Sequence, residues 1–292
     1  MQQINFLNPA QMLGMAVDYA DAKVVVFGAP FDGTTSHKAG TKFAANAMRL
    51  ESEGLETYSP LLDLDLAAAK VCDIGDASLS YGVVKRVMDE LEAVVGLILA
   101  DGKIPLMIGG EHLVSYPAVK AVANVHSDVH LIHLDAHADL RETFGGSQLS
   151  HATVLKRIWD LLGDGRIFQF GIRSGTKEEF DFARRDGHTY MEPFGLHTVD
   201  RILENLSGKK VYVTIDLDVL DPSIMSGTGT PEAGGVTYRE LAAFFLLLRH
   251  AKIDLVGADL VELSPGHDPS GVSTATACQV LREMALILDA HS

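Results

Sequence analysis

The chain has 292 residues, of which 47% are hydrophobic and 22% are charged, a balance typical of a globular protein with a substantial core. Its 24 basic and 39 acidic residues give a net charge of −15, which argues against a nucleic-acid partner because such a partner calls for clustered Lys and Arg. The two cysteines are far apart, no signal-peptide pattern opens the sequence, and the longest apolar runs are too short to span a bilayer, so we expect a cytoplasmic protein that uses neither a disulfide framework nor a membrane.

Strand-like apolar runs alternate with helical patterns along the whole chain. We predict strands over residues 23–28, 70–74, 104–108, 129–134, 166–171, 211–215 and 255–261. We predict helices over residues 83–100, 115–122, 152–162, 177–186, 198–206, 238–251 and 274–291. Several strand runs are apolar on both faces, as in parallel strands covered by helices. The alternation predicts one α/β domain over residues 1–292, a three-layer α/β/α sandwich with a mostly parallel central sheet.

Six potential metal ligands fall into three clusters, each at the end of a predicted strand: His112; Asp135, His137 and Asp139; Asp216 and Asp218. Binding sites of open α/β sheets form outside the carboxyl ends of the strands, and buried carboxylates are costly unless they are paired or bound to a cation. Four Asp and two His can surround two divalent ions, and such a set suits Mn²⁺ better than a thiolate-seeking metal. A metal pair about 3.5–4 Å apart can hold and ionise a water molecule, which indicates metal-assisted hydrolysis.

The spacing within the clusters supports this interpretation. Asp135, His137 and Asp139 lie two residues apart, which puts all three side chains on one face of an extended chain. His112 follows two glycines, which we expect to let the backbone turn sharply and bring the ring inward. The alternative, in which these residues are helix N-caps and surface turns, suits one Asp-x-Asp pair better than three clusters that all follow strands.

Seven segments carry a family resemblance: GAPFDGTTSHKAGTKF (residues 28–43), GGEH, HLDAHADLRETFGG, SHAT, DLDVLDPS, GTGTPEAGG and DLVELSP. On these segments the sequence resembles the ureohydrolase (arginase/agmatinase) family, which implies an arginase-like fold and two Mn²⁺ per chain. By this resemblance His112, Asp135, Asp139 and Asp216 would hold one ion, and Asp135, His137, Asp216 and Asp218 the other. Asp139 would also orient the bridging hydroxide.

Three further residues match family positions that act on the substrate. His151, in the SHAT segment, matches a proton-shuttling histidine, a task that suits the near-neutral pKa of an imidazole; the alternative is a structural role after the N-cap residue Ser150. Glu262 matches a carboxylate that binds the guanidinium, a planar cation that pairs well with a carboxylate; the alternative is a surface salt bridge. Thr230 matches a threonine of the substrate pocket; the alternative is a role in a turn.

The resemblance implies a hydrolase that acts on linear amidines and cleaves a small cationic guanidino compound into urea and an amine. Agmatine is the expected substrate, and guanidinobutyrate, guanidinopropionate, arginine and formiminoglutamate are alternatives. A deacetylase-like hydrolase with a single zinc ion and a non-catalytic binding protein with the same fold are rivals from other classes. The family commonly forms trimers or hexamers, so we expect a homo-oligomer.

The loop after the aspartate cluster bears on the choice of substrate. In arginases this loop resembles Asp-Ile-Asn-Thr-Pro followed by Ser-Gly-Asn, whereas residues 139–148 here read DLRETFGGSQ, without the polar groups that would receive the α-carboxylate of arginine. Arg141 could serve a carboxylate if it turned inward. Lys38-Ala39, Ala44-Ala45 and the GGEH segment, which replaces the commoner GGDH, also depart from the family pattern. These departures leave the set of metal ligands whole but alter the outer pocket, which sets the preference for the substrate's tail.

Overall fold

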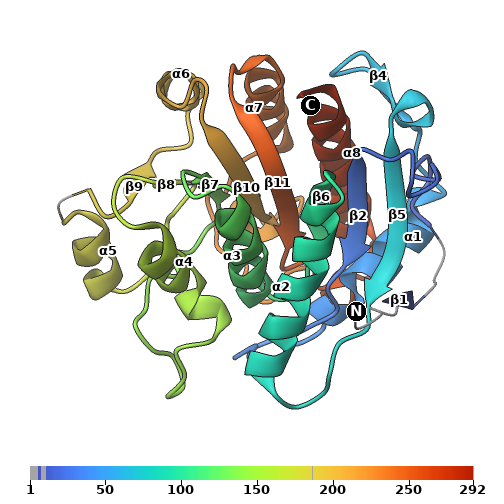
Figure 1. Ribbon diagram of the computed structural model, residues 1–292. Helices are drawn as coiled ribbons and strands as arrows, with labels where there is room; N and C mark the ends of the chain where they lie inside the picture. The colour runs from blue at the N-terminus through green and yellow to red at the C-terminus, as the bar shows by residue number, and fades with distance from the viewer. Residues whose placement is uncertain (1–5, 8–10, 186, 292) are drawn as a thin grey trace.

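The computed structural model describes residues 6–7, 11–185 and 187–291. Within them, nine strands form one sheet in the order β1-β5-β2-β6-β11-β10-β7-β8-β9 (Figure 1). Strand β1 runs antiparallel to β5, and every other pairing in this sheet is parallel. The strands are β1 Phe6–Leu7, β2 Val24–Gly28, β5 Val71–Ala77, β6 Ile104–Ile108, β7 His130–Leu134, β8 Ile167–Phe170, β9 Tyr190–Glu192, β10 Lys210–Asp216 and β11 Asp254–Val261. The predicted, mostly parallel central sheet is therefore confirmed.

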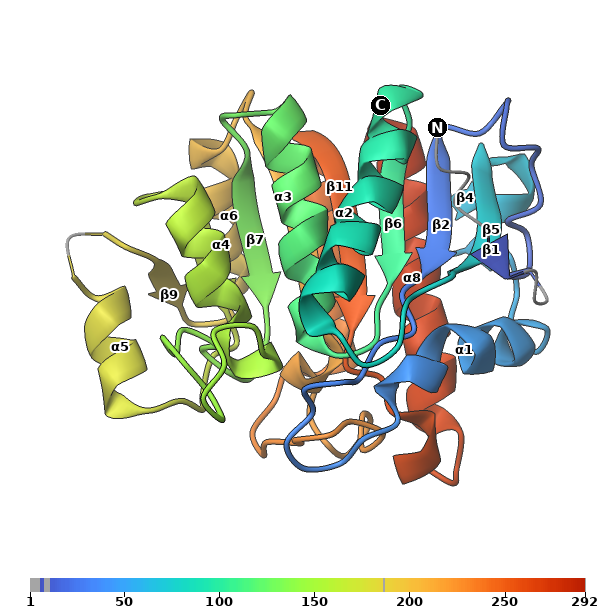
Figure 2. The ribbon, with the colours of Figure 1, turned by 60° about the horizontal axis from the view of Figure 1, so that its bottom comes forward.

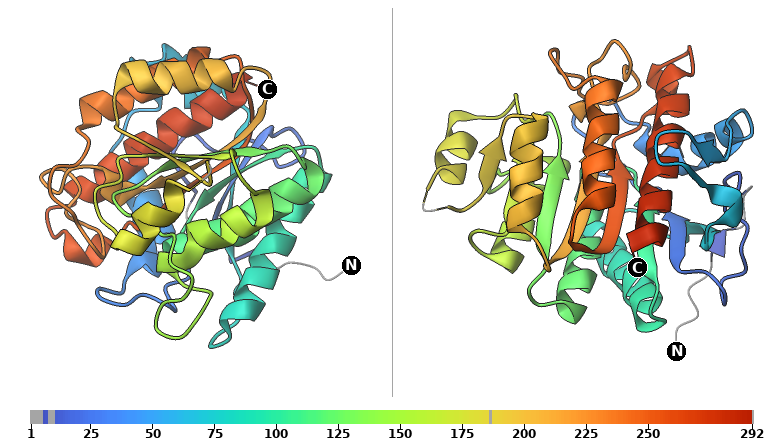
Figure 3. Two further views of the ribbon diagram at one scale, coloured as in Figure 1. Left: turned by 90° about the vertical axis from the view of Figure 1, so that its left-hand side faces the viewer. Right: turned by 90° about the horizontal axis from the view of Figure 1, so that it is seen from above.

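Helices cover both faces of this sheet, which gives the predicted three layers (Figure 3). Helices α1, α6, α7 and α8 pack on one face, and α2, α3 and α4 pack on the other. The helices are α1 Ala44–Ser52, α2 Val84–Ala100, α3 Ser115–Val125, α4 Val154–Leu162, α5 Lys177–Ala183, α6 Leu196–Asn205, α7 Tyr238–His250 and α8 Val272–His291. No helix in the described part of the chain is long and apolar enough to cross a membrane.

Alternate residues of the central strands face opposite layers. In β2, Val24 and Val26 belong to the core shared with α1 and α8, whereas Val25 and Phe27 belong to the core shared with α2 and α3. All four side chains are fully buried, which explains why the strand runs of the sequence are apolar without alternation. Burial of each such side chain contributes roughly 1.5–3 kcal/mol, so the sheet gives the loops at its edge a rigid support.

All seven predicted strands and all seven predicted helices are present, with ends that differ by a few residues. Helix α5 ends at Ala183, three residues before the predicted end, and residue 186 lies outside the described part of the chain. The prediction did not include α1, β1, β9 or a small antiparallel pair formed by β3 (Tyr58–Ser59) and β4 (Leu64–Asp65). The two cysteines, Cys72 and Cys278, are buried and free.

Helix α1 was not predicted because its inward face carries a charge. Arg49 is fully buried, where its guanidinium donates to both carboxylate oxygens of Asp73 at 2.7 and 2.9 Å and also binds Asp76. A buried arginine breaks the apolar stripe by which an amphipathic helix is recognised. The two carboxylates compensate this charge, since an unpaired buried charge would be strongly unfavourable.

Candidate active site

The predicted ligand clusters and Glu262 come from four neighbouring strands, β6, β11, β10 and β7. His112 follows β6, Asp135 follows β7, Asp216 is the last residue of β10 rather than the first residue after it, and Glu262 follows β11. Parallel strands end at the same edge of a sheet, and Figure 2 shows β6, β7 and β11 pointing towards the edge where long loops gather. The side chains of residues far apart in the sequence meet there, as the sequence predicted.

His112 lies in a cage of carboxylates. Its Nδ1 is 3.1 Å from Asp135 Oδ2, 3.3 Å from Asp139 Oδ2 and 3.3 Å from Asp216 Oδ2. The His112 ring and Asp135 are almost completely buried. Burial alone would lower the pKa of His112, but the three carboxylates raise this pKa well above its ordinary value. The cage therefore favours a positive charge at its centre.

The hydrogen bond at the other ring nitrogen of His112, Nε2, indicates which positive charge the carboxylate cage can hold. His112 Nε2 is 3.1 Å from the hydroxyl of Thr214, and this hydroxyl donates its hydrogen to Asp259 Oδ1 at 2.6 Å. Thr214 Oγ1 is therefore an acceptor, so the hydrogen between the two groups belongs to His112 Nε2. This bond leaves Nδ1 facing the carboxylate cage, where it makes no hydrogen bond, and in the neutral ring the Nδ1 lone pair points at these carboxylates. An imidazole lone pair and three carboxylates form a donor set that suits a divalent cation.

A second group of an imidazole and carboxylates lies beside the cage around His112. His137 Nδ1 is 3.0 Å from Asp218 Oδ2 and 3.5 Å from Asp135 Oδ1, and these three residues can offer ligand atoms to one ion. Burial alone would lower the pKa of His137, but Asp135 and Asp218 raise it to about 12. Burial and then the neighbouring Asp218 and Asp135 carboxylates raise the pKa of Asp216 well above its ordinary value. Asp135 is shared by the two groups.

His133 also reaches Asp135, with Nε2 2.9 Å from Asp135 Oδ2. The amide of Gln169 fixes the role of this ring, because its oxygen accepts from Thr189 Oγ1 at 2.8 Å and its NH₂ donates to the Ala138 carbonyl at 3.1 Å. The same NH₂ lies 3.1 Å from His133 Nδ1, so Nδ1 accepts and Nε2 carries the hydrogen. His133 therefore donates to Asp135 and orients this carboxylate, which leaves His112 and His137 as the imidazoles of the two groups that can serve as metal ligands.

Two residues of the site have an unusual backbone conformation. Asp63, Asp139 and Glu262 are the non-glycine residues with positive φ in the described part of the chain, and φ is 52° at Asp139 and 65° at Glu262. This region is unfavourable for residues with a Cβ, and such residues cluster at functional sites. The conformation turns the side chains of Asp139 and Glu262 towards the cage.

The turn of residues 109–112 joins the cage to Glu262. The backbone N–H of His112 donates to Glu262 Oε1 at 2.7 Å, and Glu262 N donates to the Gly110 carbonyl at 2.9 Å. The structure adds a reason for Gly110 that the sequence prediction of a sharp turn did not include: its φ is not positive, but a Cβ would lie 1.9 Å from the Phe31 carbonyl oxygen. Glycine is needed because two backbones approach closely there.

Glu262 is buried next to another acid. Burial, and then the neighbouring Glu111 carboxylate, raise the pKa of Glu262 to about 8, and Glu262 is only 8% exposed. A surface salt bridge, the alternative that the sequence left open, does not describe this position. A cationic group bound beside Glu262 would stabilise its ionised form.

His151 opens a short 3₁₀ helix, η4 (His151–Thr153), and Ser150 caps it as the sequence predicted, since Ser150 Oγ accepts from Ala152 N. The ring lies outside the carboxylate cage, with Nδ1 3.3 Å from Ser150 Oγ and Nε2 3.3 Å from Ser36 Oγ. Burial lowers the pKa of His151, so the imidazole is neutral near pH 7. Phe144 stands edge-on to the ring with centroids 5.4 Å apart.

A cavity of about 280 Å³ joins these residues. His112, the first ligand cluster, does not line this cavity. The predicted site residues that do are His137, Asp139, His151, Asp216, Thr230 and Glu262. Thr230 Oγ1 is 3.4 Å from Asp218 Oδ2, so its hydroxyl also reaches an acid of the second group. Side chains that the sequence did not assign to the site complete the wall, among them Ser36, Phe144, Ser174 and Glu179.

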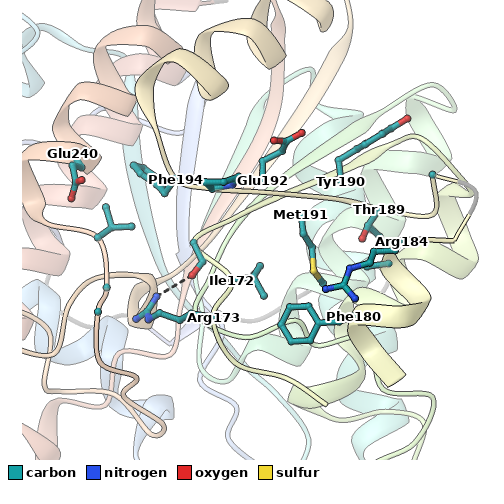
Figure 4. A pocket seen from close by; sticks show the side chains of 17 residues that line it. Ile172, Arg173, Phe180, Arg184, Thr189, Tyr190, Met191, Glu192, Phe194 and Glu240 are labelled. Atoms are coloured by element: carbon teal, nitrogen blue, oxygen red, sulfur yellow. Dashed lines mark hydrogen bonds between the residues drawn. The ribbon is translucent and has the colours of Figure 1, made fainter. Parts of the chain in front are cut away.

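A larger cleft of about 820 Å³ lies between α5, β9 and the loop before α7, and none of the predicted site residues lines it (Figure 4). Arg173 lies in its wall. The Arg173 guanidinium donates to the carbonyls of Gly171, Val219, Asp218 and Glu232 at 2.8–3.2 Å. Arg173 therefore ties the loop after β8 to the loop that carries Asp218.

Comparisons with known proteins agree on the kind of protein. The model of the arginase family matches residues 22–287. An agmatinase of Halalkalibacterium halodurans is 43% identical over 92% of this chain and 93% of its own, and a guanidinobutyrase of Pseudomonas aeruginosa is 32% identical over 93% of this chain and 88% of its own. The crystal structure of a putative agmatinase from Clostridium difficile superposes with a TM-score of 0.91 at 54% identity, covering 93% of this chain and 99% of that one.

A mostly parallel sheet with a carboxylate and imidazole cage at its carboxyl edge, together with these relatives, defines the class: the protein is an enzyme, a ureohydrolase that acts on amidines. The chain belongs to the arginase family, as the sequence segments indicated.

Proposed function

We propose that this enzyme is a manganese-dependent agmatinase, which hydrolyses agmatine to putrescine and urea. The observation that carries the proposal is the double role of His112. Its ring closes the carboxylate cage, and its backbone N–H holds the Glu262 carboxylate at 2.7 Å. A site for cations and a site for a guanidinium would thus share one turn of the chain.

The donor set fits two divalent ions. His112, Asp135, Asp139 and Asp216 would hold one, and Asp135, His137, Asp216 and Asp218 would hold the other, with Asp135 and Asp216 common to both. Carboxylates with a minority of imidazoles favour Mn²⁺. When bound, such a pair supplies an ionised water molecule and stabilises negative charge that develops during hydrolysis.

Glu262 would bind the guanidinium of the substrate. The Glu262 carboxylate is buried and fixed by the His112 N–H, so the guanidinium can pair with it in a defined orientation. This pairing would place the guanidinium carbon between Glu262 and the carboxylate cage. Asp139, whose positive φ turns it into the cavity, would orient the attacking oxygen.

His151 would handle the proton of the leaving group. In the reaction the water oxygen forms a bond to the guanidinium carbon, the bond from that carbon to the substrate's alkyl nitrogen breaks, and the amine leaves with a proton. A neutral imidazole can accept a proton from the attacking water and give it to the amine. The position of His151 in the cavity wall, outside the carboxylate cage, supports this role.

The wall of the cavity favours a substrate without a carboxylate at its tail. Arg141, which also lines the cavity, is the cation that could receive such a carboxylate. However, Arg141 Nε is 3.4 Å from Glu179 Oε2, and the guanidinium lies over the Phe144 ring at 4.9 Å. Arg141 is thus engaged by an acid and an aromatic ring, and arginine's α-carboxylate would be desolvated without a partner.

The deciding experiment compares agmatine, arginine and guanidinobutyrate in one Mn²⁺-loaded preparation by urea release. We expect the highest kcat/KM for agmatine. A higher value for arginine would contradict the proposal. A higher value for guanidinobutyrate would favour the second candidate, a guanidinobutyrase, in which Arg141 leaves Glu179 and binds the substrate's carboxylate.

A further inference from the structure

The loop that follows β2 contacts His151, and Glu111, a buried acid in the turn after β6, holds this loop in place. Glu111 is fully buried, and its carboxylate accepts from the backbone N–H of Thr34 at 2.8 Å and from the hydroxyl of Thr35 at 3.1 Å. The hydroxyl of Thr34 donates to the other oxygen of the same carboxylate. The Glu111 N–H in turn donates to the Phe31 carbonyl at 2.8 Å. Four hydrogen bonds therefore tie residues 31–35 to Glu111.

The same loop reaches His151 at two points. Thr34 Oγ1 accepts from the His151 backbone N–H at 3.2 Å, and Ser36 Oγ lies 3.3 Å from His151 Nε2. Since the Thr34 hydroxyl gives its hydrogen to Glu111, its oxygen is free to accept from His151. The Thr34 hydroxyl thus links Glu111 to His151, the first residue of η4.

We propose that Thr34, whose hydroxyl is held by Glu111, is a positioning residue for His151. This inference rests on the proposed function, in which His151 moves a proton, and assigns a task to a residue that neither binds metal nor touches substrate. The N–H of a helix's first residue has no partner inside the helix, so the Thr34 oxygen fixes where η4 begins and where the imidazole stands. Misplacing a proton-transferring group lowers the rate of the reaction more than it lowers substrate affinity.

Thr34→Val tests the inference, because valine keeps the shape of threonine and removes its hydroxyl. We expect kcat for agmatine to fall about 10-fold with KM little changed. We also expect the His151 amide, followed by NMR hydrogen exchange, to lose protection. Thr34→Ser keeps the hydroxyl and should restore both quantities.

Thr35→Val is the matched control. It removes a neighbouring hydroxyl that also donates to Glu111 but has no bond to His151, so the losses of kcat and of His151 amide protection should be much smaller than in Thr34→Val. In a His151→Asn background, Thr34→Val should cause no further loss of kcat, because residues that act as one unit are not additive.

Unchanged kcat and unchanged exchange in Thr34→Val would overturn the inference. So would equal losses of kcat in Thr34→Val and Thr35→Val, or an additive loss in the His151→Asn background. If the parent releases no urea from any guanidino compound, the proposed function fails, and the exchange of the His151 amide still decides whether Thr34 positions this residue.

Discussion

Replacing Glu262 by Gln isolates the charge that we expect to bind the guanidinium. Glutamine keeps the length of the side chain, and its oxygen can still accept from the His112 N–H, the bond that spans 2.7 Å in the parent. The variant should therefore fold normally. It also removes one of two neighbouring buried acids, Glu111 and Glu262, so the melting temperature should not fall.

The expected kinetic loss follows from the pair that is broken. A hydrogen bond to a charged group contributes about 1.5–3 kcal/mol, and about 1.4 kcal/mol corresponds to a tenfold change in rate. Glu262→Gln should therefore lower kcat/KM for agmatine by roughly 10- to 150-fold, while the protein retains both metal ions.

The assay is steady-state urea release, with the metal content measured on the same preparations. Parent-like kcat/KM in a folded, metal-loaded variant would refute the assignment of Glu262 to the guanidinium. A loss of metal together with activity would instead show that Glu262 supports the His112 turn and does not bind the substrate.

Further outcomes follow from the same structure. His151→Asn should keep two metals per chain while kcat falls by roughly 10²–10⁴-fold; loss of metal would assign His151 a different role. Removal of metal by chelation should abolish urea release, and Mn²⁺ should restore it better than Zn²⁺; full activity in protein shown to be metal-free by elemental analysis would contradict the proposed mechanism. Asp216→Ala should retain less metal than Asp218→Ala, because we assign Asp216 to both ions, and equal retention would contradict that assignment. Asp268 accepts from the Ser273 N–H in the first turn of α8 at 2.7 Å, and hydrogen bonds from Ser270 and Ser273 lower the pKa of its carboxyl. The hydrogen bonds that lower this pKa stabilise the folded state most while Asp268 is ionised. Asp268→Ala should therefore lower the free energy of unfolding by about 1 kcal/mol at pH 7, and this difference should shrink as the pH falls below about 4. Urea unfolding at several pH values measures it, and a difference independent of pH would show that the charge is not involved.

The parts of the candidate site that depend on local spacing could be predicted from the sequence as side chains that lie close together. Asp135, His137 and Asp139, and likewise Asp216 and Asp218, are recognisable because carboxylates that follow apolar strands must meet at one edge of a parallel sheet. The strands and helices could be predicted for a similar reason, since their apolar patterns repeat over many residues. Helix α1 is an exception because the buried Arg49 interrupts its pattern.

Contacts between distant residues could not be read from the sequence. The hydrogen bond from Thr34 to Glu111 joins residues 77 positions apart, and nothing in either segment specifies the other. The tautomer of His133 depends on the orientation of the Gln169 amide, which is set in turn by Thr189. Such roles follow from how the strands are arranged in space, and they became visible only in the structure.

The order of strands in the sheet has a consequence for how the enzyme matures during synthesis. Strands β10 and β11 lie between β6 and β7 but are made after both. The 127 positions that separate the end of β7 from the end of β11 take roughly 6–25 s to translate at about 5–20 residues per second. Until then, His112 and Asp135 have no common sheet to hold them together. The carboxylate cage is therefore complete only after the C-terminal third of the chain has entered the sheet.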